Sequence, residues 1–129
     1  MARQTEVLII DDEEIVCERL REHLQAEGLG VETFTESAKA LARLAEKPFD
    51  VVVTDLKMKA PNGLDVLHEI RRSSPATQVI IITGYGSIES YSEAQFGGAY
   101  EFVPKPFKAE QVAALVKKAG SKAARLKHK

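Results

Sequence analysis

Three short, largely apolar runs predict the central strands of a parallel sheet. The runs cover residues 7–10, 49–54 and 78–83. A strand whose apolar residues do not alternate with polar ones is typical of a sheet that is covered on both faces. Residues 31–34 do alternate, and residues 102–103 are followed by Pro104 and Pro106, which a central strand would not tolerate. These two segments are therefore predicted to be the edge strands.

Between the predicted strands, apolar residues recur at three- and four-residue spacing, which predicts helices that each pack one stripe on the sheet. Ile15, Val16, Leu20 and Leu24 show this spacing in the first such segment. We expect strands near residues 6–10, 30–34, 49–54, 78–83 and 100–104, and helices near residues 13–27, 37–46, 63–73, 87–96 and 108–119. Because the two kinds of element alternate, we predict an α/β fold with a doubly wound, five-stranded parallel sheet.

Length and composition narrow the class of protein. The chain has 129 residues, enough for one domain that needs neither metal nor disulfide to fold. Its 18 lysines and arginines are balanced by 19 aspartates and glutamates, so no broad positive field favours direct nucleic-acid binding. The single Cys17 excludes an internal disulfide, and no apolar run is long enough to span a membrane. We therefore expect a cytoplasmic location.

The end of the chain differs in composition from the rest. Residues 117–129 are rich in lysine and arginine and contain no acidic residue. We interpret this stretch as a frayed, solvated helix end, which the helix dipole favours, rather than as a nucleic-acid site. The domain is accordingly expected to cover residues 1–120, and residues 121–129 are expected to be a basic tail or the start of a linker.

Three carboxylates are expected to meet at one edge of the predicted sheet. Asp11 and Asp12 directly follow the first strand, and Asp55 follows the third. Open parallel sheets bind their ligands at the carboxyl ends of the strands, beside the point where the strand order reverses. Carboxylates that lie this close repel one another unless a hard divalent cation lies between them, and Mg²⁺ is the natural candidate.

A hydroxyl and an ammonium group are expected at the same edge. Thr83 ends the fourth predicted strand and Lys105 ends the fifth. Together with the carboxylates and a cation, they suit a phosphoryl group, with one carboxylate as the nucleophile. Each feature alone has an ordinary structural explanation; the acidic run 11–14, for instance, is usual in a helix cap. Their coincidence at the same end of four predicted strands favours a functional site.

Four short motifs carry a resemblance to a known family. They are residues 10–13 (Ile-Asp-Asp-Glu), 54–58 (Thr-Asp-Leu-Lys-Met), 82–85 (Ile-Thr-Gly-Tyr) and 104–107 (Pro-Lys-Pro-Phe). In this order and spacing, residues 6–118 resemble the receiver domain of two-component response regulators, most of all those of the nitrogen-regulation type. The resemblance implies a flavodoxin-like receiver fold with the strand order 2-1-3-4-5.

The resemblance also implies a role for each carboxylate. Asp55 would accept a phosphoryl group from the phosphohistidine of a histidine kinase or a phosphotransfer protein. Asp12 and Asp55 would bind Mg²⁺ directly, Asp11 mainly through water, and Lys57 through its backbone carbonyl. The domain would assist its own phosphorylation and dephosphorylation, and it would not be an enzyme with a separate substrate.

The same resemblance implies how the phosphorylated state is read. Thr83 would hydrogen-bond to the aspartyl phosphate, and Lys105 would pair with it, with a cis peptide bond before Pro106 setting the direction of the lysine. Thr83 and Phe102 would be the switch residues. The fourth helix, fifth strand and fifth helix would form the face that contacts an effector domain in the same chain, a separate protein, or a second copy in a homodimer.

Two features depart from the usual receiver pattern. Lys59 stands where the family often has a proline, which removes one source of stiffness from the loop that follows Asp55. The expected helix at residues 87–96 has few aliphatic residues, so we expect it to pack weakly and to be the mobile element of the switch.

Two other functions remain as alternatives. The first is a small phosphatase or phosphotransferase that acts on a soluble substrate through an aspartyl phosphate. It is weakened because Lys57, rather than a second aspartate, stands two residues after Asp55. The second is a flavin or nucleotide binder, which is disfavoured because no glycine-rich loop follows the first strand.

Overall fold

The computed structural model describes residues 4–84, 92, 95 and 97–127, which form an alternating series of strands and helices. The strands are β1 (Glu6–Ile10), β2 (Gly30–Phe34), β3 (Val51–Asp55), β4 (Gln78–Thr83) and β5 (Glu101–Pro104). The helices are α1 (Glu14–Ala26), α2 (Ser37–Glu46), α3 (Gly63–Ser73) and α5 (Ala109–Lys127). The helix expected at residues 87–96, with its predicted weak packing and mobility, falls almost entirely outside the described residues. None of the described helices has the length and apolar content that a bilayer span requires.

All five strands are parallel, and their order is β2-β1-β3-β4-β5. This order confirms the predicted sheet and places the alternating strand β2 and the proline-limited strand β5 at its edges. After β1 the chain moves outward to β2, and after β2 it returns across β1 to form β3. The loops that follow β1 and β3 therefore diverge to opposite faces, which leaves a crevice between their carboxyl ends.

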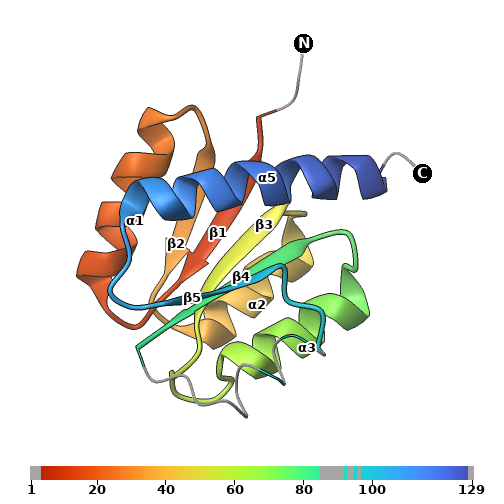
Figure 1. Ribbon diagram of the computed structural model, residues 1–129. Coiled ribbons are helices and arrows are strands. Elements are labelled where there is room, and N and C mark those ends of the chain that lie inside the picture. Colours follow the sequence, from red (N-terminus) through yellow and green to blue (C-terminus); the bar gives the residue numbers. More distant parts are fainter. Residues whose placement is uncertain (1–3, 85–91, 93–94, 96, 128–129) are drawn as a thin grey trace.

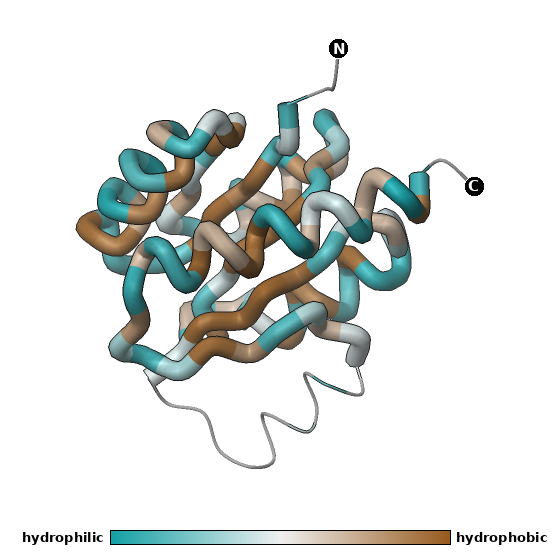
Figure 2. Tube along the Cα trace, turned by 45° about the horizontal axis from the view of Figure 1, so that its top comes forward, coloured by the Kyte–Doolittle hydropathy of each residue, from teal (hydrophilic) through white to brown (hydrophobic). Residues whose placement is uncertain are grey.

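Helices cover both faces of the sheet, with α1 and α5 on one face and α2 and α3 on the other (Figure 1). Successive residues of a strand point to opposite faces, so each central strand feeds two cores. In β1, Val7 and Ile9 pack against α1 and α5, whereas Leu8 and Ile10 pack against α2 and α3. The hydropathy trace in Figure 2 shows the same strands as hydrophobic stretches inside more polar helices. Burial on both faces explains why these strands lack polar alternation.

Helix α5 continues well beyond its predicted end, which corrects the expectation that it stops near residue 119. It runs to Lys127, and Ala123 within this extension is fully buried. Gly120 lies over Thr5, and a Cβ at this position would lie 2.8 Å from the Thr5 Cγ2, so a larger residue would require the Thr5 side chain or the helix to shift. The Lys127 Nζ lies 2.8 Å from an oxygen of Asp50, directly before β3. The basic stretch thus has an acidic partner that lies 77 residues away.

Candidate functional site

The three predicted carboxylates converge at the carboxyl ends of β1 and β3. Asp11 and Asp12 follow β1, and oxygens of Asp11, Asp12 and Asp55 all lie within 4.8 Å of one another. Asp55 is the last residue of β3 rather than the first residue of the following loop, because it still pairs with Ile82 of β4. Asp11 and Asp55 are buried, with 3% and 7% of their surface exposed, whereas Asp12 is exposed.

Lys105, directly after β5, brings one ammonium group into this cluster. Its Nζ lies 3.4 Å from an oxygen of Asp11 and 3.4 Å from an oxygen of Asp55. The backbone N–H of Lys105 donates to the carbonyl of Thr83, the buried last residue of β4, over 2.9 Å. The peptide bond between Lys105 and Pro106 is cis, as expected. The predicted acids, hydroxyl-bearing residue and lysine therefore meet at the same edge of the sheet.

The electrostatics of the cluster favour an added cation. Burial raises the pKa of Asp55, and the nearby Lys105 charge only partly offsets this effect. Burial also raises the pKa of Asp11; the Glu13 backbone N–H opposes that shift, while the Asp55 carboxylate adds to it. Burial alone would lower the pKa of Lys105, but the Asp11 and Asp55 carboxylates outweigh it and raise that pKa. Oxygen ligands held close together by the fold match the donor set of a hard divalent cation.

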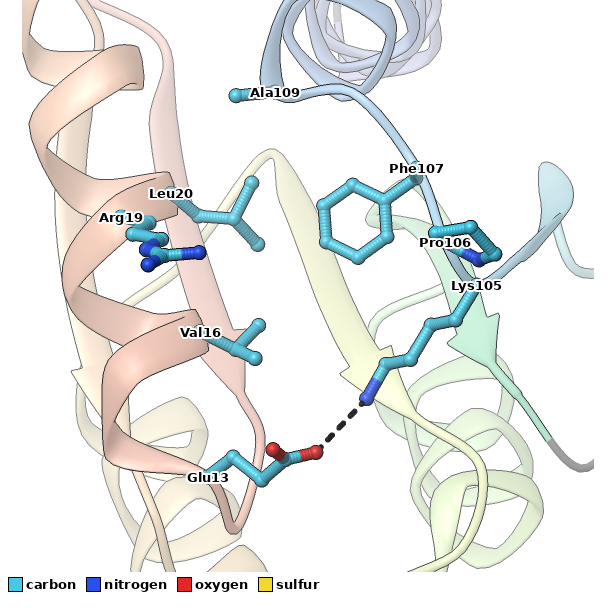
Figure 3. Close-up of a pocket in the computed structure, with 8 residues that line it drawn as sticks. All are labelled: Glu13, Val16, Arg19, Leu20, Lys105, Pro106, Phe107 and Ala109. Atoms are coloured by element: carbon cyan, nitrogen blue, oxygen red, sulfur yellow. Dashed lines mark hydrogen bonds and ion pairs between the residues drawn. The ribbon is translucent and has the colours of Figure 1, made fainter.

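Glu13 is a member of the site for which the sequence predicted no role in the chemistry, although it belongs to the acidic run 11–14 and to the motif at residues 10–13. It is the N-cap residue of α1, but its side chain makes no cap hydrogen bond. Its Oε1 instead lies 3.5 Å from the Lys105 Nζ (Figure 3). The capping-like contact comes from Asp11, whose carboxylate accepts from the Glu13 backbone N–H over 2.8 Å. The acidic run alone could not show that Asp11 binds the helix backbone and Glu13 binds Lys105, because Lys105 lies 92 residues away in the sequence.

A pocket of about 570 Å³ opens beside Lys105, between α1 and the segment that joins β5 to α5. In Figure 3, Val16 and Leu20 of α1 face Phe107 across this pocket, and Lys105 and Glu13 close one end. The helical spacing identified Val16 and Leu20 as apolar stripe residues. This spacing could not predict that Val16 and Leu20 border a pocket, because the opposite wall includes Phe107, which is distant in the sequence.

The loop after Asp55 is held close to the site by Gly63, the first residue of α3. A Cβ at Gly63 would lie 2.4 Å from the Asp55 carbonyl oxygen and 2.7 Å from the Leu56 Cα, so no side chain fits there. Asn62 caps α3 by accepting from the backbone N–H groups of Leu64 and Asp65 over 3.0 Å each. The loop therefore turns back onto the residue that carries the central carboxylate.

The two predicted switch residues lie on neighbouring strands at the same side of the sheet. Thr83 ends β4, while Phe102 lies in β5 and pairs in register with Ile81. Phe102 is partly buried and packs against the core cluster beneath α2 and α3. Gly84 follows Thr83, and a Cβ there would be in ordinary van der Waals contact with Lys105, 3.6 Å from its Cβ.

Comparisons with known proteins agree with this geometry. Residues 7–117 match the family described as the response regulator receiver domain. A putative NtrX-like response regulator of Rickettsia felis is 36% identical over 118 residues, which make up 90% of this chain and 25% of that protein. The DNA-binding transcriptional regulator NtrC of Escherichia coli is 34% identical over 113 residues, or 88% of this chain and 24% of that protein. The chain spans about a quarter of the length of these relatives.

Solved structures show the same likeness across nearly the whole chain. A response regulator receiver domain protein from Clostridium thermocellum superposes with a TM-score of 0.88 at 32% identity, covering 95% of this chain and 98% of that one. The beryllofluoride-activated receiver domain dimer of NtrC4 superposes with a TM-score of 0.86 at 35% identity, covering 92% and 98%.

Proposed function

Because the chain belongs to the response regulator receiver family of two-component signalling, we propose that it accepts a phosphoryl group on Asp55 from the phosphohistidine of a histidine kinase or a phosphotransfer protein. One observation carries the proposal: the buried Asp55 carboxylate lies 3.4 Å from the Lys105 Nζ and within 4.8 Å of oxygens from Asp11 and Asp12. We place the reaction in the cytoplasm, where the free, buried Cys17 is expected to stay reduced.

In the proposed transfer, an Asp55 carboxylate oxygen attacks the phosphorus atom. The bond between phosphorus and the donor imidazole nitrogen breaks, and the nitrogen keeps the electron pair. Lys105 neutralises part of the negative charge on the phosphoryl oxygens, and the Thr83 hydroxyl donates a hydrogen bond to one of them. Such fixed charges and donors at the reacting group are the main source of catalysis in phosphoryl transfer. The domain thus assists its own modification and needs no separate substrate.

The proposal includes a Mg²⁺ ion held directly by Asp12 and Asp55, through water by Asp11, and by the backbone carbonyl of Lys57. The ion would supply positive charge beside the transferred phosphoryl group. Three carboxylates around one lysine support this assignment, because the group carries more negative than positive charge and the pKa of both buried acids is raised by burial. Mg²⁺ keeps several waters and is usually bound by one or two carboxylates, so we expect weak binding in the absence of phosphate.

The pocket between α1 and the β5–α5 segment is the surface that we assign to the phosphoryl donor. Val16, Leu20 and Phe107 give it an apolar lining, and Lys105 connects it to Asp55. Ile15 on the same helix is 52% exposed, which is unusual for a large apolar side chain in this protein. A donor protein that buries this surface would bring its phosphohistidine next to Asp55.

We further propose that phosphorylation is read on a face that includes β5 and α5, together with the helix expected at residues 87–96, which lies largely outside the described residues. Thr83 would move toward the phosphoryl group, and Phe102 would fill the space that Thr83 leaves. A hollow of about 410 Å³ on this face has a lining that includes the apolar Phe102, Val103 and Leu115 and the charged Glu101 and Lys118. It could receive an effector domain that follows α5 in the same chain, a separate effector protein, or a second copy of the domain. One similar solved structure is described as a receiver domain dimer.

Acetyl phosphate with Mg²⁺ tests the proposed function. The wild-type protein should take up about one hydroxylamine-sensitive phosphoryl group per molecule, and Asp55→Asn should take up none. Glu22→Gln is the matched control, because Glu22 is an exposed carboxylate on α1 and is not a member of the Asp11, Asp12 and Asp55 cluster. Full labelling of Asp55→Asn would contradict the assignment of the acceptor. Continuous hydrolysis of acetyl phosphate without stable label would favour a phosphatase instead.

A further inference from the structure

The hydroxyl of Ser37 ties the start of α2 to the loop that follows Asp55. Ser37 is the first residue of α2 and is only 6% exposed. Its Oγ donates to the Pro61 carbonyl over 2.6 Å, and the Lys59 carbonyl oxygen lies 3.5 Å away. A serine at a helix start usually accepts from its own helix, but this hydroxyl donates to a segment 24 residues further along the chain.

The two ends of this loop are held by backbone hydrogen bonds. Leu56 N–H donates to the Ile82 carbonyl over 3.2 Å, and Gly63 N–H donates to the Leu56 carbonyl over 3.0 Å. Between them, Lys57, Lys59 and Ala60 are exposed to solvent. Because its ends are fixed and its middle is exposed, the loop can move mainly by rotating about its two ends. The hydrogen bond from Ser37 to the Pro61 carbonyl opposes that movement.

The tether borders the candidate metal site. A hollow of about 350 Å³ lies between the start of α2 and the loop, and its lining includes Ser37, Met58 and Lys59 together with the carboxylate-bearing Asp12. If the loop moved, this hollow would change shape, and the Lys57 carbonyl would move with the loop relative to Asp12 and Asp55. The Ser37 bond therefore acts on the same atoms that we propose to surround the cation.

We propose that Ser37 is a positioning residue for the phosphoryl-acceptor site, holding the loop that carries the Lys57 carbonyl at its working distance from Asp55. This inference rests on the proposed function, which supplies the reaction that Ser37 supports. The short bond is largely shielded from water, and such a bond constrains the groups that it joins more strongly than an exposed one. Because the loop is anchored at both ends, loss of the bond should loosen the loop and leave the core intact.

The test compares Ser37→Ala with Ser73→Ala. Ser73 is the matched control, because its hydroxyl also donates to a backbone carbonyl, that of Glu69 over 2.8 Å, but on the exposed side of α3. In Mg²⁺-free protein, Ser37→Ala should speed amide hydrogen exchange at Lys57 and Met58 by about fivefold, the amount expected from the loss of one neutral hydrogen bond. Mg²⁺ binding, followed by amide chemical shifts, should weaken by a similar factor. Ser37→Thr, which keeps the hydroxyl, should restore both.

The outcomes separate this inference from the proposed function. If Ser37→Ala exchanges at Lys57 and Met58 as the wild type does, Ser37 has no positioning role, even if Asp55 is still labelled. If Ser37→Ala lowers the urea midpoint but leaves loop exchange and Mg²⁺ affinity of the folded protein unchanged, the role is structural only and the inference is overturned. If the wild type takes up no label, the proposed function fails, while the exchange measurement still decides whether Ser37 holds the loop.

Discussion

The end of α5 should be anchored to the sheet by Lys127, and its replacement by alanine tests this anchor. The Lys127 Nζ lies 2.8 Å from one oxygen of Asp50, and the other Asp50 oxygen accepts from the Glu6 backbone N–H over 2.8 Å. The Asp50 side chain is only 2% exposed, whereas that of Lys127 is 28% exposed. Lys127→Ala would remove this ammonium group from its contact with a buried carboxylate.

The size of the effect follows from this intermediate burial. Exposed ion pairs contribute about 0–1 kcal/mol, and removal of one partner from a fully buried pair costs about 3–5 kcal/mol. With one partner buried and the other near the surface, we expect Lys127→Ala to lower the free energy of unfolding by about 1–2 kcal/mol. For a domain of this size, that corresponds to a fall in Tm of roughly 4–8 °C.

Urea unfolding of Lys127→Ala, Asp50→Asn and the double variant measures the effect and the coupling between the two side chains. Lys39→Ala is the matched control: it is also a helical lysine, and its pair with Glu36 has side chains that are 72% and 64% exposed. We expect this control to change stability by less than about 0.5 kcal/mol. If Lys127→Ala behaves like Lys39→Ala and shows no coupling to Asp50→Asn, the end of α5 is not anchored and the reasoning is refuted.

Three further outcomes are expected. Gly63→Ala should cost about 1–3 kcal/mol in urea unfolding and slow the labelling of Asp55, because its Cβ would collide with the Asp55 carbonyl; wild-type stability would contradict this. Hydrogen bonds from Arg43 lower the pKa of Glu32; burial opposes this shift, and Lys47 adds to it. The Glu32 carboxylate therefore stabilises the fold above its unfolded-state pKa of about 4.3, and this stabilisation is lost at lower pH. Glu32→Gln should therefore be less stable than the wild type at pH 7, and the difference should shrink as the pH falls through the lowered folded-state pKa of Glu32. Burial, with a further contribution from the Asp11 charge, raises the pKa of Cys17 to about 11, so iodoacetamide at pH 8 should modify the native thiol at least about 100-fold more slowly than the urea-unfolded thiol; similar rates would argue against its burial.

Most of the fold could be predicted because its signals are local. The strands at residues 6–10, 30–34 and 78–83 begin and end where the hydrophobic patterns predicted, and helices α2 and α3 have their predicted bounds. A continuous apolar run predicts a strand that is buried on both faces, and a proline predicts a strand at the edge of the sheet. Each of these features lies within the segment whose structure it predicts. The predicted end of α5 was wrong because the buried partner of its basic residues, Asp50, lies in a different part of the chain.

The kinds of residue at the functional site, and the edge of the sheet on which they lie, follow from the sequence, because parallel strands place their carboxyl ends together. The sequence thus predicted the meeting of Asp11, Asp12, Asp55 and Lys105, which the fold confirms. Only the tertiary structure decided which further atoms join them. Glu13 contacts Lys105 rather than capping its own helix, and Ser37 donates to the loop after Asp55 rather than to α2. Each of these contacts depends on two segments whose separation is set by packing, and a pattern within one segment carries no information about the distance to another.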